Sequence, residues 1–525
     1  MFQHRLFWVI SWFVAAWLLA GCGGSSKPPA GPKAKKAVRA PIAKRTDDGA
    51  RPGRRASSQP KTPAASPDES PAPKPVSEAN SPPVPADSPV EEPKQRRENS
   101  LAALLAETGD AMPRMIPDLP RMNVDETKAA AAGIRKLSAK HLTLYTDLES
   151  DEQVDVLPEV FDRAFPQWCE YFGIDPAKHP DWSMTGFLMK DKARFQRARL
   201  LPATLPPFEH GYCRNYEFWL YEQPSAYYRR HLVLHEGTHG FMNTMLGGCG
   251  PPWYMEGIAE LLATHRWADG KLTMNYLPAT REEVPMWGRI KIVRDAVAAG
   301  QGKYLHEVMK FGPTAHRQTE PYGWCWAAAT LLDRHPGYCE RFRRLYHLVL
   351  EPDLSGRFYQ MMADDWEELS EEWQVFISTL EYGHNVPKTA IEFTPGRPLA
   401  PGGSTVTVAA DRGWQSSGVQ LEGGTTYRLR ASGRYQVADQ PQIWWCEPGG
   451  VSIRYYQGRP LGILLAAVRP DKPQNAPSVF FRPEVVGLGT VLTPEQTGTL
   501  YFKINDSAAE LDDNAGTLSV EIQRN

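Results

Sequence analysis

Residues 229–242 read RRHLVLHEGTHGFM, and the pentapeptide HEGTH occupies positions 235–239 of this stretch. Residues four apart lie on one face of a helix, so His235 and His239 can reach one tetrahedral metal ion while Glu236 lies beside it. The alternative is a helix that carries surface or core histidines. With 13 His and 61 acidic residues in 525, the pattern His-acid-x-x-His arises by chance about 0.04 times per chain. The surrounding sequence therefore has to decide between the two.

A second predicted helix places acidic side chains close to these histidines. The first helix is predicted over about 226–246 and the second over about 253–265, after a Gly-Gly stop and a Pro-Pro turn. Glu256 follows His239 by 17 residues, and Glu260 lies on the same helix face four residues later. Both stand in an otherwise apolar stretch, where an unpaired buried carboxylate is costly. Since a catalytic zinc ion takes three protein ligands and leaves its fourth position to water, the pattern predicts a zinc site.

The two helices resemble those of a known group of metallopeptidases. HEGTH followed by WYMEGIAELLA resembles the gluzincin clan, whose second helix carries an E-G-x-A or N-E-x-x-x-[DE] motif. More narrowly, YYRRHLVLHEGTHGFM with PPWYMEGIAELLATH is similar to a peptidase-MA-like family of bacterial extracytoplasmic proteins. The likeness covers about 138–383 and is strongest over 216–266. It implies a zincin-type α+β metallopeptidase domain, which we expect over 101–385.

The resemblance assigns a role to each of these side chains. The implied zinc ligands are His235, His239 and Glu256. The implied general base is Glu236, and Glu260 matches the acid that orients the first ligand histidine. Because the 17-residue gap is short for the clan, Glu260 stays open as the third ligand in place of Glu256.

The implied mechanism needs a proton carrier and a group that stabilises the oxyanion. Zinc polarises the scissile carbonyl and lowers the pKa of its water, while Glu236 takes the proton and passes it to the leaving amine. Gluzincins also use a Tyr or His at the oxyanion, and Tyr322, which opens the predicted helix YGWCWAAATLLDRH, resembles that tyrosine. The alternative for Tyr322 is a packing aromatic. Tyr254 and His265 are further candidates, and His231 is expected to begin the first helix or to support the ligands.

Periodicity predicts the remaining elements of this domain. Alternating apolar and polar residues indicate strands, and a spacing of three to four indicates helices. We expect strands at 138–147, 184–190, 216–222 and 271–277, and helices at 154–173 and 322–335. The mixture indicates an α+β domain.

The sequence from 388 to 525 differs in character. Short β-rich runs alternate with Gly, Pro and Asp turns, among them TYRLRASGRYQV, GILLAAV, SVFFRP and GTLSVEIQ. About eight such runs indicate an antiparallel, all-β sandwich.

This second domain resembles the PA-IL-like galactose-binding lectins, a calcium-dependent jelly-roll family, through TYRLRASGRY, GRPLGILLAAV and LYFKINDSAAELDDNAGTLSVEI. The implied calcium ligands are Asp506, the Glu510 carbonyl, Asp513 and Asn514, with an extra acid at Asp512 and a further carbonyl at Val437. Hard oxygen ligands on one loop suit calcium, whereas the alternative is an acidic turn that caps a hairpin. The family's His-Pro-x-x-Gln stretch, which contacts sugar, is absent between 441 and 457. Trp444 and Trp445 are expected either to stack on a sugar or to fill the core.

The first 22 residues resemble a lipoprotein signal peptide. A basic start precedes the apolar run 6–20, and Leu19-Ala20-Gly21-Cys22 resembles the lipobox of bacterial lipoproteins. In that family the cysteine is acylated, so Cys22 would anchor the protein to a membrane; the alternative is an uncleaved membrane anchor. Residues 23–100, rich in Pro, Ala and Lys, are expected to form a disordered tether. Six further cysteines are expected to form one or two disulfides or to stay as buried free thiols.

These expectations combine into one preferred function and one alternative. A net charge of −2 and a pI near 6.7 give no reason to expect a nucleic-acid partner. The preferred function is a lipid-anchored extracytoplasmic zinc metallopeptidase acting on protein, peptide or glycopeptide substrates. The alternative is a catalytically idle surface protein that binds glycans or calcium through its lectin-like domain. Glu236 favours the enzyme, because an idle descendant has no physical need for a carboxylate beside the metal.

Overall fold

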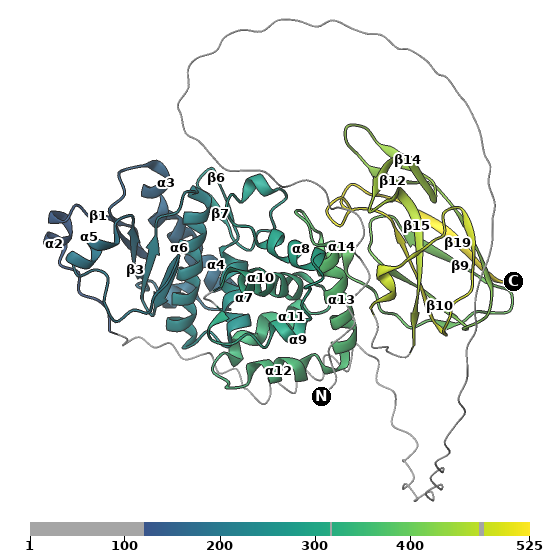
Figure 1. The fold of residues 1–525 in the computed structure, drawn as a ribbon, viewed down its shortest axis with the longest axis horizontal. Helices are drawn as coiled ribbons and strands as arrows, with labels where there is room; N and C mark the ends of the chain where they lie inside the picture. The colour runs from purple at the N-terminus through teal and green to yellow at the C-terminus, as the bar shows by residue number, and fades with distance from the viewer. Residues whose placement is uncertain (1–119, 316–317, 472–476) are drawn as a thin grey trace, which may run out of the picture. The chain divides into compact units, whose positions relative to one another are not determined.

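The computed structural model describes residues 120–315, 318–471 and 477–525. The expected signal peptide, Cys22, the tether and the first residues of the catalytic domain lie outside these ranges. By their contacts, the described residues belong to one compact unit, drawn in colour in Figure 1. Among the described residues, no helix is both long and apolar enough to cross a membrane.

A five-stranded mixed sheet forms the N-terminal part of the described chain (Figure 1). In spatial order its strands are β1 (Arg135–Ser138), β2 (Leu142–Thr146), β3 (Met184–Met189), β5 (Glu217–Tyr221) and β4 (Gly211–Arg214). β2, β3 and β5 are parallel, whereas β1 and β4 run antiparallel at the two edges. The inner strands read as nearly continuous apolar runs because both of their faces are buried.

Helices cover both faces of this sheet. They are α2 (Glu126–Ala131), α3 (Glu152–Asp155), α4 (Leu157–Tyr171), α5 (Lys192–Arg197) and α6 (Ala226–Phe241). α4 and α6 pack on one face, while Phe195 of α5 joins Phe187 and Trp219 in an apolar cluster on the other. Every residue of α6 after Ala226 is buried. A polar side chain on this helix therefore needs a partner inside the protein.

The chain then forms a helical layer against α6 (Figure 1). Its helices are α7 (Pro252–Ala263), α8 (Arg289–Ala298), α9 (Leu305–Val308), α10 (Thr319–Arg334), α11 (Cys339–Arg343), α12 (Leu354–Met361), α13 (Trp366–Thr379) and α14 (Val386–Thr389). A short hairpin of β6 (Arg266–Ala268) and β7 (Lys271–Thr273) follows α7. α7 packs between α6 and α10. It approaches α10 so closely that a Cβ on Gly257 would lie 3.0 Å from the Cys325 carbonyl oxygen.

The C-terminal residues fold into a β-sandwich with its own core. One sheet has the order β14-β15-β18-β10-β8, with β16 beside β15; the other has the order β17-β11-β19-β9; and β12 pairs with β13. Their bounds are β8 (Arg397–Pro398), β9 (Ser404–Ala409), β10 (Gln415–Leu421), β11 (Tyr427–Ser432), β12 (Tyr435–Ala438), β13 (Trp444–Cys446), β14 (Gly449–Tyr456), β15 (Arg459–Pro470), β16 (Glu484–Val485), β17 (Gly489–Leu492), β18 (Gly498–Ile504) and β19 (Thr517–Arg524). Strand β11 alternates strictly between buried and exposed residues, as expected for a sheet with one face on the core.

The structure confirms the α+β class and corrects several elements. The strand expected over 138–147 is wrong in part, because Ser138 ends β1 and Leu142 begins β2, with a turn between them. The strand expected at SVFFRP is also wrong. Ser478 there caps a 3-10 turn over Val479–Phe481, and its hydroxyl accepts a hydrogen bond from the Phe480 amide.

Candidate metal centre

Three side chains from two helices bring one ligand atom each to a single point. His235 and His239 extend from α6 and Glu256 from α7, and all three are more than nine-tenths buried. The two Nε2 atoms lie 3.1 Å apart. Glu256 Oε2 lies 3.3 Å from Nε2 of His235 and 3.4 Å from Nε2 of His239. Bonds of about 2.0–2.1 Å to a tetrahedral zinc ion place ligand atoms roughly 3.3–3.4 Å apart, so two sides of this triangle match that spacing and the side between the two histidines is slightly shorter.

The chemistry of this triangle also fits a cation. Glu256 Oε2 is buried and has no hydrogen-bond partner, which is costly for a carboxylate in a protein interior. Burial lowers the pKa of His235, but Glu256 and Glu260 outweigh this effect and hold that pKa well above its ordinary value. Burial raises the pKa of Glu256, but His239 and His235 outweigh it and lower that pKa to about 2. A bound cation would replace the proton that these groups otherwise share.

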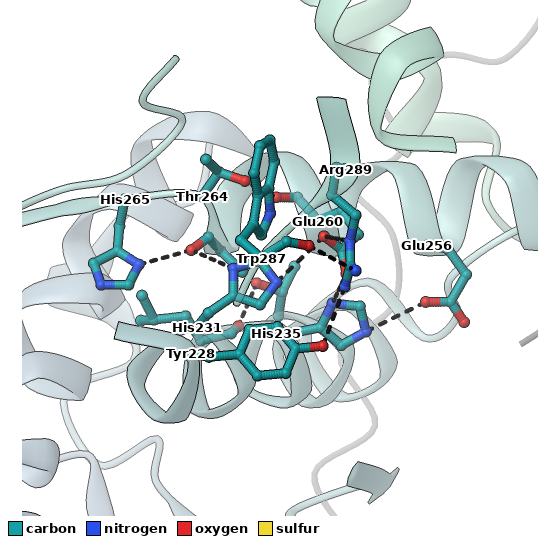
Figure 2. Close-up of polar contacts among 12 residues, drawn as sticks. Tyr228, His231, His235, Glu256, Glu260, Thr264, His265, Trp287 and Arg289 are labelled. Carbon is teal, nitrogen blue, oxygen red and sulfur yellow. Dashed lines mark hydrogen bonds and ion pairs between the residues drawn. The ribbon is translucent and has the colours of Figure 1, made fainter. Parts of the chain in front are cut away.

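Glu260 faces a different partner. Arg289, the first residue of α8, donates from Nε to Glu260 Oε2 at 2.9 Å and from Nη2 to Oε1 at 2.8 Å (Figure 2). Glu260 Oε1 also lies 3.4 Å from His235 Nδ1. Both carboxylate oxygens are therefore engaged on the side of His235 that faces away from Glu256. Between the two glutamates left open by the sequence, the geometry places Glu256 against both Nε2 atoms.

His231 and His265 support the end of α7 and do not reach the triangle. Their Nδ1 atoms lie 3.0 and 2.8 Å from the same carbonyl oxygen, that of Ala263 (Figure 2). His231 Nε2 lies 3.2 Å from Glu260 Oε2. Burial lowers the pKa of both histidines, that of His265 to about 3. His231, His235 and Glu260 are also spaced as a metal-binding group, but the two hydrogen bonds from Arg289 already occupy the carboxylate.

Glu236 lies between α6 and the edge strand β4. It is 6% exposed, and a Cβ at Gly211 of β4 would clash with its Oε1. Burial raises the pKa of Glu236, while His235 and His239 oppose this rise. The carboxylate thus stands beside the ligand triangle and next to an edge strand whose smallest residue leaves room for it.

Of the tyrosines suggested by the sequence, Tyr322 reaches the site and Tyr254 does not. The Tyr322 ring lies 5.9 Å from the His235 ring, and Arg289 Cζ lies 5.4 Å from the Tyr322 ring centroid. Burial raises the pKa of Tyr322, and the charges of Glu256, Glu236 and Glu260 raise it further. Tyr254 packs instead in the apolar core, with its ring 5.8 Å from the ring of Trp253.

A second group of polar side chains gathers in the loop between β18 and β19. Asp506 is fully buried, and its Oδ2 accepts a hydrogen bond of 2.9 Å from Asn514 Nδ2. Asn514 Oδ1 and Asp513 Oδ1 are buried without a hydrogen-bond partner. Burial raises the pKa of Asp506 to about 7. Gln436, next to Val437 on β12, donates to the Asp513 carbonyl oxygen at 2.6 Å.

Two further acids of this loop pair with basic side chains, and the two neighbouring tryptophans differ in exposure. The Glu510 carboxylate accepts hydrogen bonds of 2.7 and 2.8 Å from Arg454, and Asp512 pairs with Lys388 at 3.2 Å. Trp444 packs against the sandwich core, whereas Trp445 is 51% exposed.

The six described cysteines are all free thiols: Cys169, Cys213, Cys249, Cys325, Cys339 and Cys446. The expected disulfide bridges are therefore wrong, and the free-thiol alternative holds. Sequence reasoning also missed Arg289 and Gly211. Neither lies in a recognisable motif, and each reaches the site from an element distant along the chain.

No model of a known protein family matches the sequence, and no curated protein matches it. Among solved structures, a chain described as "EclA N-terminal domain; PllA-like lectin" is 24% identical to this chain. The match covers 23% of this chain and 95% of that one, with a TM-score of 0.18. A TM-score this low carries no argument about the function.

Proposed function

We propose that the protein is an extracytoplasmic zinc metallopeptidase of the zincin type. The observation that carries this proposal is the triangle of His235 Nε2, His239 Nε2 and Glu256 Oε2, with sides of 3.1–3.4 Å and the buried carboxylate of Glu236 next to it in the sequence. Two imidazoles and a carboxylate are the ligand set of a catalytic zinc ion that keeps one position open.

The side chains around the triangle have separate tasks in this proposal. When bound, zinc supplies a Lewis acid that polarises a carbonyl and makes a water molecule acidic. Glu236 would accept a proton from the attacking water and return it to the leaving amine. Glu260, held by Arg289, lies 3.4 Å from His235 Nδ1 and would orient this ring so that Nε2 faces the metal. The Tyr322 hydroxyl donates to the oxyanion.

The position of β4 favours an extended peptide as substrate. β4 pairs with β5 on one side and forms the edge of its sheet, so its other side offers backbone groups to an added strand. Glu236 lies against Gly211 at the start of this strand. A peptide paired with β4 would therefore pass beside the general base, and main-chain pairing would bind many sequences. Proteins, peptides and glycopeptides all contain the extended main chain that pairing with β4 requires.

A second candidate function is calcium binding by the β-sandwich. Such binding also underlies the alternative function, that of a catalytically idle surface protein that binds glycans. The specific observation is the pair of buried, unpartnered oxygens, Asn514 Oδ1 and Asp513 Oδ1, in the loop where Asn514 bonds to buried Asp506. Oxygen-only ligands suit Ca²⁺. The exposed ring of Trp445 is a surface on which a sugar can stack.

The proposed location is the extracytoplasmic side of a bacterial membrane, at its periplasmic or cell-surface face, with a lipid on Cys22 as anchor. This proposal rests on the sequence Leu19-Ala20-Gly21-Cys22 after an apolar run.

Metal analysis paired with a digest of a proteome-derived peptide library tests the enzyme directly. The full-length protein should contain one zinc ion per chain and cleave peptides, and Glu236→Gln should keep the zinc but not the cleavage. If the zinc-loaded wild type cleaves no protein, peptide or glycopeptide, and Glu236→Gln binds glycans and calcium as the wild type does, the idle binding protein replaces the enzyme.

A further inference from the structure

The loop of residues 506–514, here called the cation loop, has contacts of two kinds. Its two ends carry the side chains proposed above as cation ligands: Asp506 at one end, Asp513 and Asn514 at the other. The residues between them contact the chain that follows α13. This inference rests on the proposed calcium site of the β-sandwich and extends it.

The ends of the cation loop are brought together but not fully satisfied. The 2.9 Å hydrogen bond from Asn514 Nδ2 to Asp506 Oδ2 closes the loop. Asn514 is 5% exposed, and its Oδ1 has no partner. A buried amide oxygen without a donor is costly unless a ligand supplies the missing interaction. A divalent cation with oxygen preference satisfies this oxygen and both carboxylates together.

The middle of the cation loop is bound to residues 381–388, here called the docking segment. Four hydrogen bonds join them: Ser507 Oγ to Glu381 Oε1 at 2.7 Å, the Asn385 amide to the Ala508 carbonyl at 2.8 Å, Lys388 Nζ to the Leu511 carbonyl at 2.9 Å and Asn385 Nδ2 to Asp512 Oδ1 at 2.9 Å. Ala508 and Leu511 are also buried. The loop residues in these contacts, Ser507, Ala508, Leu511 and Asp512, all lie between the two ligand-bearing ends.

This arrangement makes the two sets of contacts depend on one backbone conformation. The middle of the cation loop can contact the docking segment only when Asp506 and Asn514 lie close together. The same approach of the two loop ends is needed for them to bind one cation. The loop also carries four acids in nine residues, Asp506, Glu510, Asp512 and Asp513. Their repulsion opposes closure unless positive charge is present.

We propose that a divalent cation bound by Asp506, Asp513 and Asn514 locks the β-sandwich onto the docking segment. Cation binding and docking then stabilise each other by the same factor, because coupling between two sites is reciprocal. Loss of the cation releases the cation loop from residues 381–388 without unfolding either sheet.

The test uses two variants of the docking segment in the full-length protein, with Ca²⁺ alone as the probe in calorimetric titrations. Lys388→Met removes the contacts to Leu511 and Asp512. Asn385→Asp loses the donor to Asp512 but keeps an acceptor for the Lys388 amide, which it caps in α14. Both changes make the surroundings of a cation more negative, so simple electrostatics predicts tighter Ca²⁺ binding. The coupling predicts the opposite, a loss of about fivefold or more.

Arg454→Met is the matched control. Arg454 lies on β14 and pairs with Glu510 of the cation loop, so this change removes one positive charge beside the loop by a contact that does not involve the docking segment. It should leave Ca²⁺ affinity unchanged or raise it. A second measurement is hydrogen exchange of the Asn385 amide, which Ca²⁺ should slow in the wild type and not in Lys388→Met.

The outcomes separate this inference from the site on which it rests. If the wild type binds Ca²⁺, Asp506→Asn does not, and the docking variants bind as tightly as the wild type or more tightly, the calcium site stands and the lock is overturned. If the wild type binds no Ca²⁺, both are overturned.

Discussion

Arg289 and Glu260 form a buried, two-bonded ion pair, with Nε and Nη2 of the arginine 2.9 and 2.8 Å from the two carboxylate oxygens. Glu260 in turn lies 3.4 Å from His235 Nδ1. The pair thus connects α8 to α7 and to the first proposed ligand on α6. It holds the carboxylate ionised in a place where burial alone would favour the neutral acid.

Replacing Arg289 should therefore weaken both stability and metal binding. Arg289→Met leaves Glu260 buried without its partner, so we expect a loss of about 3–5 kcal/mol in the free energy of unfolding. Zinc affinity should fall by roughly 10–100-fold, because the ligand His235 loses its orientation. Arg341→Met is the control, since Arg341 forms a buried pair with Asp365 in another part of the helical layer. It should destabilise the protein but leave zinc affinity, measured by chelator competition, unchanged.

The choice of Glu256 as third ligand predicts a clear order among the ligand variants. His235→Ala, His239→Ala and Glu256→Gln should each abolish stoichiometric zinc, measured by metal analysis after dialysis. Glu260→Gln should only weaken binding, because its carboxylate faces Nδ1 of His235 and Arg289. Full zinc occupancy in Glu256→Gln, with none in Glu260→Gln, would show that the ligand is the other carboxylate.

Glu236 should be needed for catalysis and not for the stability of the fold. Glu236→Gln should keep the zinc content and the melting temperature, and peptide hydrolysis should fall by about 10²–10⁴-fold because the amide cannot accept a proton. Tyr322→Phe should lower kcat by roughly 10²–10³-fold if its hydroxyl serves the oxyanion. An unchanged kcat in Tyr322→Phe would assign the ring to packing alone.

The β-sandwich should respond to pH through Asp506. Burial raises its pKa to about 7, whereas an unfolded aspartate titrates near about 3.9. Without a cation, the contribution of Asp506 to the free energy of unfolding should therefore fall as the pH rises from about 4 to about 7. In this range only the unfolded state loses the proton. The proposed Ca²⁺ site needs the ionised form of Asp506, so stabilisation of the protein by Ca²⁺ should grow as the pH rises through about 7. Melting curves with Ca²⁺ or chelator should show both trends, and Asp506→Asn should show neither.

The predicted lipid anchor has a simple test. Cys22→Ala should release the protein from the membrane fraction or block its processing, because the acylated thiol is lost. Unchanged fractionation and unchanged size would indicate an uncleaved anchor instead.

The helices that carry the site could be predicted because their signals are local. The four-residue spacing of His235 and His239, the Gly-Gly stop and the apolar run around Glu256 all lie within short windows. α7 ends within a few residues of its predicted position, whereas α6 ends at Phe241 and the last predicted turn, Met242–Leu246, is a π-helix. Short stretches of sequence thus predict both helices, but they do not predict the contacts that position them.

The residues that complete the site could not be predicted because their roles arise from contacts distant in the sequence. Arg289 lies 29 residues from Glu260, in a stretch with no motif. The edge strand β4 escaped prediction because its four residues are all half-buried and show no alternation. The SVFFRP run has strand-like composition, but Ser478 satisfies the Phe480 amide locally and so favours a turn.

The free thiols matter for the question of which atoms would coordinate the proposed metal ion. Thiolates are strong zinc ligands, and a thiol competes only when it loses its proton. Burial raises the pKa of Cys213, Cys249 and Cys325, and the acids of the ligand triangle or its neighbours raise each of them further. The carboxylates of the proposed zinc site thus also help to keep these three thiols neutral. We therefore expect these thiols to stay protonated and the proposed zinc ion to be held by nitrogen and oxygen ligands alone.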